Sequence, residues 1–253
     1  MALLVKSNLL IWMVVLCLAT LNASAKTLQL VTLDYPPYIY NNNGKVDGIA
    51  TRVVEEVFRR LNQPIEIQIL PWARSIHYLK TGKADAIYTI FKTPERLAFA
   101  DYSQLVLFDQ NIALFTNANQ DIAFNGELKE LSEYIFCVEI GVSYGKIFDE
   151  AVKSGLITKM TETRSARQCM NLLLRKRVDI WINNHFGGLA IAKSESALPY
   201  IHTLASSIQS TPSYIAFSKI NQHQKIRDQF DRVFQEMIKD GTYDNIVAEF
   251  IGN

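Results

Sequence analysis

The chain has 253 residues, in which 26 lysines and arginines stand against 25 aspartates and glutamates, a formal net charge of +1 at pH 7. A balance this close to zero excludes nucleic-acid binding and polybasic attachment to a membrane surface as main modes of action, because both use an excess of Lys and Arg.

The first 25 residues are predicted to be a secretory signal peptide that is cleaved after Ala25. One cation, Lys6, precedes an uncharged apolar run from Leu9 to Leu21, and small residues follow before the cleavage point. The run is short for a bilayer core of about 30 Å, which favours cleavage over a retained membrane helix. We therefore expect a soluble periplasmic protein with 25 basic and 25 acidic residues, since only Lys6 is lost.

The first part of the mature chain is predicted to alternate strands and helices. Apolar residues at helical spacing from Thr51 indicate an amphipathic helix, and short apolar runs on either side of it indicate strands. In chain order the expected elements are a strand at Leu28–Leu33, the helix from Thr51, a strand at Ile65–Leu70, a helix from Trp72 to Gly82 and a strand at Ala84–Ile90. This β-α-β-α-β order predicts a parallel sheet covered by helices.

A second unit of the same kind follows the long strand predicted at Gln104–Phe115. Its expected elements are strands at Tyr134–Ile140, Ile157–Met160 and Val178–Ile182, with helices at Tyr144–Lys153 and Ala166–Arg175. One more strand, Ser213–Phe217, and two amphipathic helices end the chain.

The pattern therefore predicts an α/β protein with two lobes. Each lobe would hold a mixed, mostly parallel sheet flanked by helices. Residues 26–112 and 216–253 would form lobe 1, and residues 113–215 would form lobe 2. Two extended crossings, near Ile112–Phe115 and Ser213–Phe217, would serve as a two-strand hinge. Because open α/β sheets bind ligands beyond the carboxyl ends of their strands, we expect the site in the cleft between the lobes.

Two cysteines remain in the mature chain, Cys137 and Cys169. An even pair in an oxidising compartment is a candidate disulfide, and two buried thiols are the alternative. Their spacing does not match a C-x-x-C redox or metal motif, and no cofactor or metal is expected.

Short motifs occur along the whole mature chain in a characteristic order. They are Tyr35-Pro36-Pro37-Tyr38, Gly44-Lys45-Val46-Asp47-Gly48, Gly82-Lys83-Ala84-Asp85-Ala86, Thr93-Pro94-Glu95-Arg96, Asp101-Tyr102-Ser103, Gly141-Val142-Ser143-Tyr144-Gly145, Arg177-Val178-Asp179 and Asp240-Gly241-Thr242-Tyr243. In this order and spacing they resemble the family-3 extracellular solute-binding proteins, best known from polar amino-acid ABC transporters.

The resemblance implies a type II periplasmic-binding fold that holds a small carboxylate-bearing ligand, an amino acid or a related organic acid, for an ABC importer. The expected partners are this ligand and the membrane permease of the importer, and the protein is expected to be a monomer and not an enzyme. One alternative is a sensory protein that docks on a membrane sensor.

Arg96 is the first candidate for a ligand contact, because the resemblance makes it the guanidinium that binds a ligand carboxylate. A surface ion pair with a neighbouring acid is the alternative. Thr89 is a candidate hydroxyl partner. Lys92 is a further candidate for a ligand contact, although it departs from the family pattern, in which a small hydroxyl residue is common at that position.

Aromatic side chains are candidates for the walls of the site. The resemblance places Trp72 over the ligand and Tyr35 on the opposite wall, where flat faces could hold a side chain or a cation. Trp72 could equally be a core residue at the start of a helix. Arg74, in a Pro-Trp-x-Arg string, is a secondary candidate.

Polar candidates in the second lobe are Ser143 and Asn184. The resemblance places Ser143 at a helix start that could bind the carboxylate, although an ordinary N-cap is the alternative. Asn184 stands about where amino-acid binders carry the acid that pairs with the ligand ammonium, and an amide does not neutralise that charge. Asp34 could supply the missing charge. Otherwise Arg96, Lys92 and Arg74 would make the cleft cationic and suited to an organic anion.

An enzymatic relative of the family offers a third possibility, because some members are dehydratases of prephenate-like acids. That chemistry needs a general acid in the cleft. His185 and His77 are the histidines that could serve, and a solvated or packed role is the alternative that we favour for both.

Overall fold

The computed structural model describes residues 26–251, so the predicted signal peptide lies outside the described residues. Within residues 26–251, none of the helices has both the length and the apolarity needed to cross a bilayer.

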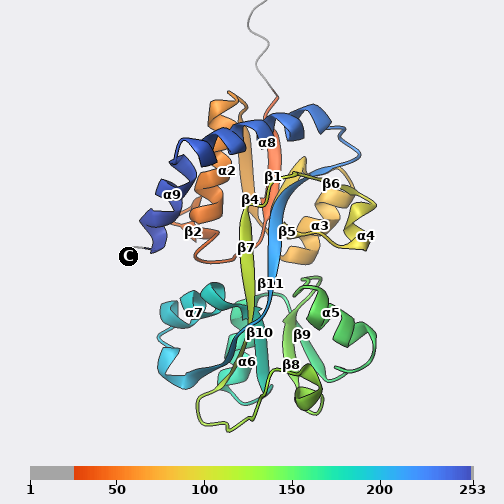
Figure 1. The fold of residues 1–253 in the computed structure, drawn as a ribbon, viewed down its shortest axis with the longest axis vertical. Coiled ribbons are helices and arrows are strands. Elements are labelled where there is room, and N and C mark those ends of the chain that lie inside the picture. Colours follow the sequence, from red (N-terminus) through yellow and green to blue (C-terminus); the bar gives the residue numbers. More distant parts are fainter. Residues whose placement is uncertain (1–25, 252–253) are drawn as a thin grey trace, which may run out of the picture.

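Two lobes stacked along the long axis are joined by two long strands, as Figure 1 shows. The upper lobe carries both the first and the last elements of the chain, and the lower lobe is made from the middle of the sequence. This arrangement confirms the predicted α/β, two-lobed fold class.

The upper lobe is built on three parallel strands in the order β4-β1-β5. They are β1 (Leu28–Thr32), β4 (Ile65–Ile69) and β5 (Ala86–Phe91). The helices of this lobe are α2 (Ile49–Arg60), α3 (Trp72–Lys80), α4 (Pro94–Leu97), α8 (Gln224–Lys239) and α9 (Thr242–Ile251), and its small strands are β2 (Tyr40–Asn42), β3 (Lys45–Asp47) and β6 (Ala100–Tyr102). The core lies between sheet and helices, with Leu30, Ile87 and Phe230 fully buried.

The lower lobe repeats this plan with the parallel strands β10-β8-β9. They are β8 (Phe136–Glu139), β9 (Met160–Thr163) and β10 (Ile180–Asn184), with helices α5 (Lys146–Lys153), α6 (Ala166–Leu174) and α7 (His185–Ser194). A disulfide between Cys137 and Cys169 joins β8 to α6.

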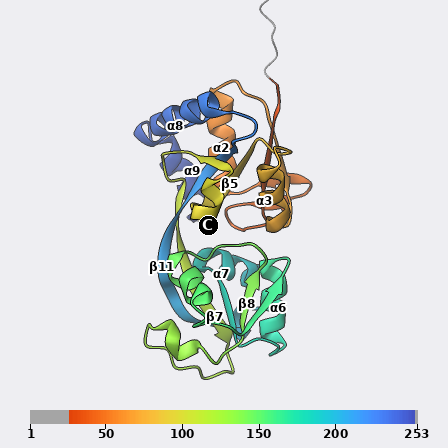
Figure 2. The ribbon, with the colours of Figure 1, turned by 90° about the vertical axis from the view of Figure 1, so that its right-hand side faces the viewer.

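The two crossings are β7 (Phe108–Asn117) and β11 (Ile201–Ser218), which pair antiparallel and run along one side of the molecule in Figure 2. Residues Ser213–Phe217 of β11 pair with β5 of the upper lobe, and β7 pairs with β10 of the lower lobe. One continuous sheet of nine strands therefore passes through both lobes.

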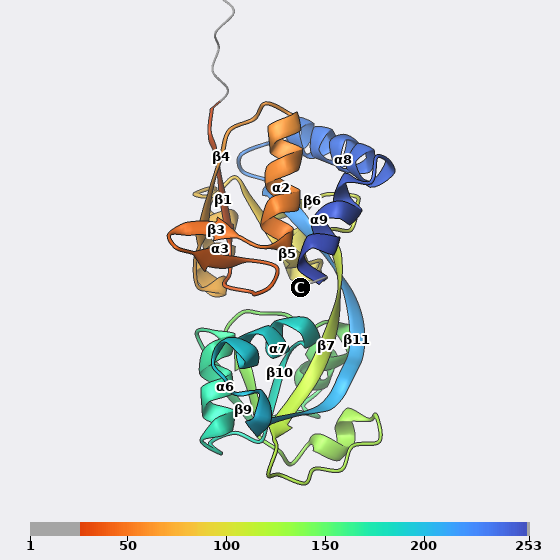
Figure 3. The same ribbon diagram turned by 90° about the vertical axis from the view of Figure 1, so that its left-hand side faces the viewer.

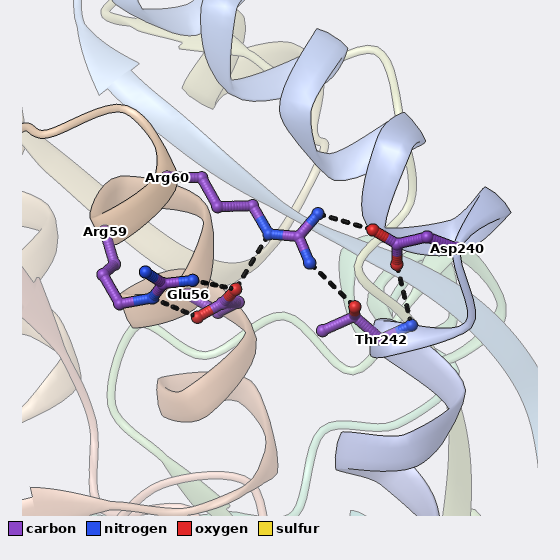
Figure 4. A network of polar contacts seen from close by, with 5 residues as sticks. All are labelled: Glu56, Arg59, Arg60, Asp240 and Thr242. Carbon is purple, nitrogen blue, oxygen red and sulfur yellow. Dashed lines mark hydrogen bonds and ion pairs between the residues drawn. The ribbon is translucent and has the colours of Figure 1, made fainter.

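The C-terminal helices are fixed to the upper lobe by a cluster of ion pairs, drawn in Figure 4. Arg60, in the last turn of α2, donates to Glu56 at 2.8 Å, to Asp240 at 2.7 Å and to the Thr242 hydroxyl at 2.7 Å. Arg59 also donates to Glu56. Such exposed pairs contribute little energy singly, but here they join α2 to the start of α9, which lies beside α2 and α8 in Figure 3.

Strand β9 begins three residues later than predicted, at Met160, and β7 begins four residues later, at Phe108. Two further elements differ more from expectation. Helix α7 was not predicted, because Gly187 and Gly188 interrupt its apolar pattern. Gly188 lies so close to the Phe115 ring that a Cβ there would overlap it, so the glycine allows α7 to pack on β7. Strand β11 begins at Ile201, well before the predicted Ser213. The sequence did not indicate this first half as a strand because it is polar and its backbone hydrogen bonds are made only with β7.

Candidate functional site

A pocket with an empty volume of about 490 Å³, part of it open to solvent, lies between the lobes. It is lined by residues from both, at or just beyond the carboxyl ends of β1, β5, β8 and β10, where open α/β sheets bind ligands. The lining residues are Leu33, Tyr35, Trp72, Thr89, Phe91, Arg96, Ile112, Glu139, Val142, Ser143, Tyr144, Asn183 and Asn184. We call this space the central pocket.

Arg96 reaches the central pocket from α4, a short helix that begins with Pro94 and is capped by Thr93. The side chain is only 7 % exposed. Its guanidinium donates to the Phe91 carbonyl at 3.0 Å and to the Gly141 carbonyl at 3.1 Å. Because Gly141 belongs to the lower lobe, this arginine connects the two lobes.

The Arg96 guanidinium forms no ion pair with any acid among residues 26–251. Burial lowers its pKa, against the opposite influence of Tyr102 and Asp149. A guanidinium has five N–H donors, and the two carbonyls take only part of them. A buried positive charge with spare donors is suited to an anion.

Two further donors in the pocket wall lack a partner. Trp72 Nε1 and Asn183 Nδ2 are buried, and neither makes a hydrogen bond within the described part of the chain. Leaving a buried donor unpaired costs about 1–3 kcal/mol. The Trp72 ring also faces Arg96, whose Cζ lies 5.5 Å from the ring centroid. Arg96, Trp72 and Asn183 thus make the pocket lining rich in donors.

Thr89 lies in a distorted part of β5. Its φ is 62°, a left-handed conformation that is rare for a β-branched residue. In the ladder with β11, Tyr214 pairs with Ile90 and Ile215 with Tyr88, so Thr89 bulges from the sheet at the pocket. Its hydroxyl donates to the Tyr88 carbonyl at 2.6 Å. Strain of this kind, of order 1–3 kcal/mol, is concentrated at functional sites.

Asn184 takes part in a network at the hinge. Its Nδ2 donates to Gln110 Oε1 at 2.8 Å and to the Asn111 carbonyl at 3.3 Å, and its Oδ1 accepts from the Gly187 N–H, which caps α7. Tyr35 donates to the same Gln110 oxygen at 3.2 Å. In this conformation the Asn184 amide has no donor left for a ligand, which gives a structural reason for an amide at this position.

Ser143 lines the pocket, but its hydroxyl is also engaged. It donates to Asp149 in a short hydrogen bond and accepts from the Gly145 N–H at 3.3 Å. Asp149 in turn accepts from the Tyr144 N–H at 3.0 Å. The serine therefore organises the start of α5.

Three other candidates lie outside the central pocket. Lys92 is exposed and its Nζ lies 4.6 Å from the Tyr214 ring centroid, in a neighbouring cavity. Arg74 is exposed on α3. Asp34 is an exposed residue directly after β1 that is absent from the pocket lining, and partial desolvation raises the pKa of its carboxyl. The structure does not bring these three to Arg96.

Neither histidine lines the central pocket. His77 is exposed on α3, and His185 begins α7 with its ring stacked 6.4 Å from that of Phe115. This is the solvated or packed placement that the sequence favoured.

Glu139, at the end of β8, is a pocket residue that the sequence interpretation missed. It is 7 % exposed and forms no ion pair with a cation of the described chain. Burial and the nearby charge of Asp34 raise its pKa to about 8, although the backbone N–H groups of Ala166 and Trp72 act in the opposite direction. A single acid in the apolar run Phe136–Ile140 was the available signal, because buried acids without a partner are rare.

Comparison with known proteins was made on sequence and on structure. The bacterial extracellular solute-binding proteins, family 3, match residues 29–253. The probable amino-acid-binding protein YxeM of Bacillus subtilis is 23% identical over 216 residues, which are 85% of this chain and 79% of that protein.

Solved structures of similar fold include the following two. An ancestral arginine-binding protein bound to arginine has a TM-score of 0.78 at 23% identity, over 89% of this chain and 98% of that one. A histidine kinase sensor domain with similarity to periplasmic binding proteins has a TM-score of 0.80 at 19% identity, over 90% of this chain and 97% of that domain. The match across residues 29–253 confirms the predicted resemblance: the chain belongs to the bacterial extracellular solute-binding proteins, family 3.

Proposed function

We propose that this protein captures a small ligand with a carboxylate group, an amino acid or a related organic acid, in the central pocket. Arg96 carries this proposal, because it is a buried guanidinium in the pocket with no acidic partner among residues 26–251. The unpaired donors of Trp72 and Asn183 support it, since a carboxylate accepts several hydrogen bonds.

The experiment is a thermal-shift screen of purified protein with amino acids, dicarboxylates and aromatic acids. Each hit is then compared with its carboxamide, which keeps the shape and removes the charge. A ligand at 100 times its Kd stabilises the fold by about 2.7 kcal/mol, which corresponds to a rise in Tm of about 5–10 °C for a chain of this size. Equal shifts with acid and amide would contradict the proposal.

The bound ligand is proposed to be passed to the permease of an ABC importer in the periplasm. The family to which the chain belongs supports this role. The measurement is uptake of the labelled ligand by cells with and without the gene. Loss of uptake is the expected result, and normal uptake with an altered transcriptional response to the ligand would instead indicate a sensory role.

We propose that the ligand leaves the site chemically unchanged. Glu139 is the only acid among the residues that line the central pocket, so it is the group that a dehydratase would use. Incubation with prephenate and arogenate is expected to yield no product. Turnover that is lost in Glu139→Gln would reverse this conclusion.

A further inference from the structure

The central pocket holds two buried ionisable side chains, a guanidinium and a carboxyl group, that do not pair with each other. Arg96 and Glu139 are both 7 % exposed and both line the pocket. Neither forms an ion pair within residues 26–251. Burial without a partner disfavours the charged form of each group, and a ligand group of the opposite charge would favour it.

The two groups occupy different parts of the pocket. Arg96 contacts the Phe91 and Gly141 carbonyls and the Trp72 ring. Glu139 lies where α3 and α6 begin, near the backbone N–H groups of Trp72 and Ala166. The two side chains therefore have different contacts, Arg96 with the Phe91 and Gly141 carbonyls and Glu139 with the starts of two helices, which indicates two subsites.

We propose that Glu139 receives a cationic group of the ligand, an ammonium or a guanidinium, at a part of the central pocket distinct from the Arg96 subsite. The inference rests on the proposed function, since Arg96 is taken to hold the carboxylate. The ligand is then a zwitterion whose cation is carried on its side chain, away from the carboxylate.

The surroundings of Glu139 favour this assignment over a purely structural role. Burial and Asp34 raise the pKa of Glu139 to about 8, so a neutral acid occupies the site near pH 7 until a cation arrives. Electrostatic effects link Glu139 to Asp34, Tyr35 and Tyr144, and none of these supplies a positive charge. Arg167 on α6 is the nearby cation that acts on Asp34, and it forms its ion pair with Glu195. A bound cation would lower the pKa of Glu139 and drive its ionisation.

The test compares ligands that differ only in the side-chain cation. Lysine is paired with norleucine and arginine with citrulline, and each Kd is measured by isothermal titration calorimetry. The wild type is expected to prefer the cationic member of at least one pair by tenfold or more. Glu139→Gln, which keeps a carbonyl oxygen for the backbone donors, is expected to remove at least tenfold of that preference.

Glu162→Gln is the matched control, because it makes the same charge change at an exposed site on the adjacent strand β9. It should leave the preference unchanged. Equal binding of the paired ligands by the wild type, or a preference that Glu139→Gln retains, would overturn the inference.

A second measurement needs no variant. Titrations at pH 7 in two buffers of different ionisation enthalpy count the protons released on binding. Release of up to about one proton is expected with lysine or arginine, and none with norleucine or citrulline. Equal proton release within each pair would contradict the inference.

Failure of this inference can be distinguished from failure of the proposed function by Arg96→Gln. If Arg96→Gln binds none of the four ligands while Glu139→Gln binds them like the wild type, the proposed carboxylate capture is supported and the proposed cation subsite is wrong. If the wild type binds only acids that lack a cation, the cation subsite falls in the same way. If it binds no carboxylate at all, both fall.

Discussion

Replacing Arg96 tests the central claim about the pocket. The side chain uses part of its five donors on the Phe91 and Gly141 carbonyls, and the rest are available to the proposed carboxylate. Removing one partner of a buried, hydrogen-bonded charge pair weakens binding by about 2–5 kcal/mol. For Arg96→Gln we therefore expect a Kd about 30-fold to several thousand-fold higher. Arg96→Lys keeps the charge but not the forked donors, so its Kd should lie between those of the wild type and Arg96→Gln.

The assay is calorimetric titration with the carboxylate identified in the screen. Thermal unfolding of each variant shows that the fold is retained. The matched control is Arg74→Gln, which removes an exposed guanidinium outside the central pocket and should leave the Kd within about threefold. The reasoning is refuted if folded Arg96→Gln binds the carboxylate as well as the wild type does, or if Arg74→Gln is weakened equally.

Three further predictions concern stability and strain. Burial would raise the pKa of Asp85, but hydrogen bonds from Gln29, His223 and Asn221 hold it below its usual value of 3.8. Asp85→Asn should lower the free energy of unfolding by about 3 kcal/mol at neutral pH. The part of this stabilisation that depends on ionisation is present above the unfolded pKa and lost as the pH falls through the folded one, so the difference in stability between the two proteins should become smaller in acid. Parallel curves down to pH 2 would contradict it. Replacing Cys137 and Cys169 by alanine opens a loop of 32 residues. The free energy of unfolding, measured by urea denaturation, should fall by about 3–4 kcal/mol; a decrease below about 1 kcal/mol would contradict the expected stabilisation by loop closure. Thr89→Gly relieves the positive φ, so stability should stay within about 1 kcal/mol while ligand affinity falls several-fold in calorimetry; unchanged affinity would remove Thr89 from the site.

Local patterns predicted most of the fold. The helix that became α2 has Val53, Val54, Val57 and Phe58 on one buried face, a 3.6-residue period that is independent of the rest of the chain. Strands β1, β4 and β5 lie within two residues of their predicted bounds, because apolar runs between turn residues carry the same local information.

Elements whose stability is non-local were missed or shortened. The first half of β11 is rich in Ser and Thr, and only its pairing with β7 makes it a strand. Helix α7 depends on the capping amide of Asn184 and on the close approach of Gly188 to Phe115. Neither the long ladder nor the close approach follows from the spacing of residues along the chain.

The candidate site also combines features that follow from the local sequence with features that depend on distant contacts. The sequence by itself determined the family and the two-lobed fold and named Arg96 as the first candidate for a ligand contact, because motif order and local periodicity are properties of the chain alone. Only the tertiary structure decided that Glu139 lines the pocket with Arg96, that Asn184 is occupied at the hinge, and that Lys92 and Arg74 lie elsewhere. The physical reason is that burial and charge pairing depend on which distant segments the fold brings together, and β7 and β11 bring both lobes to one pocket.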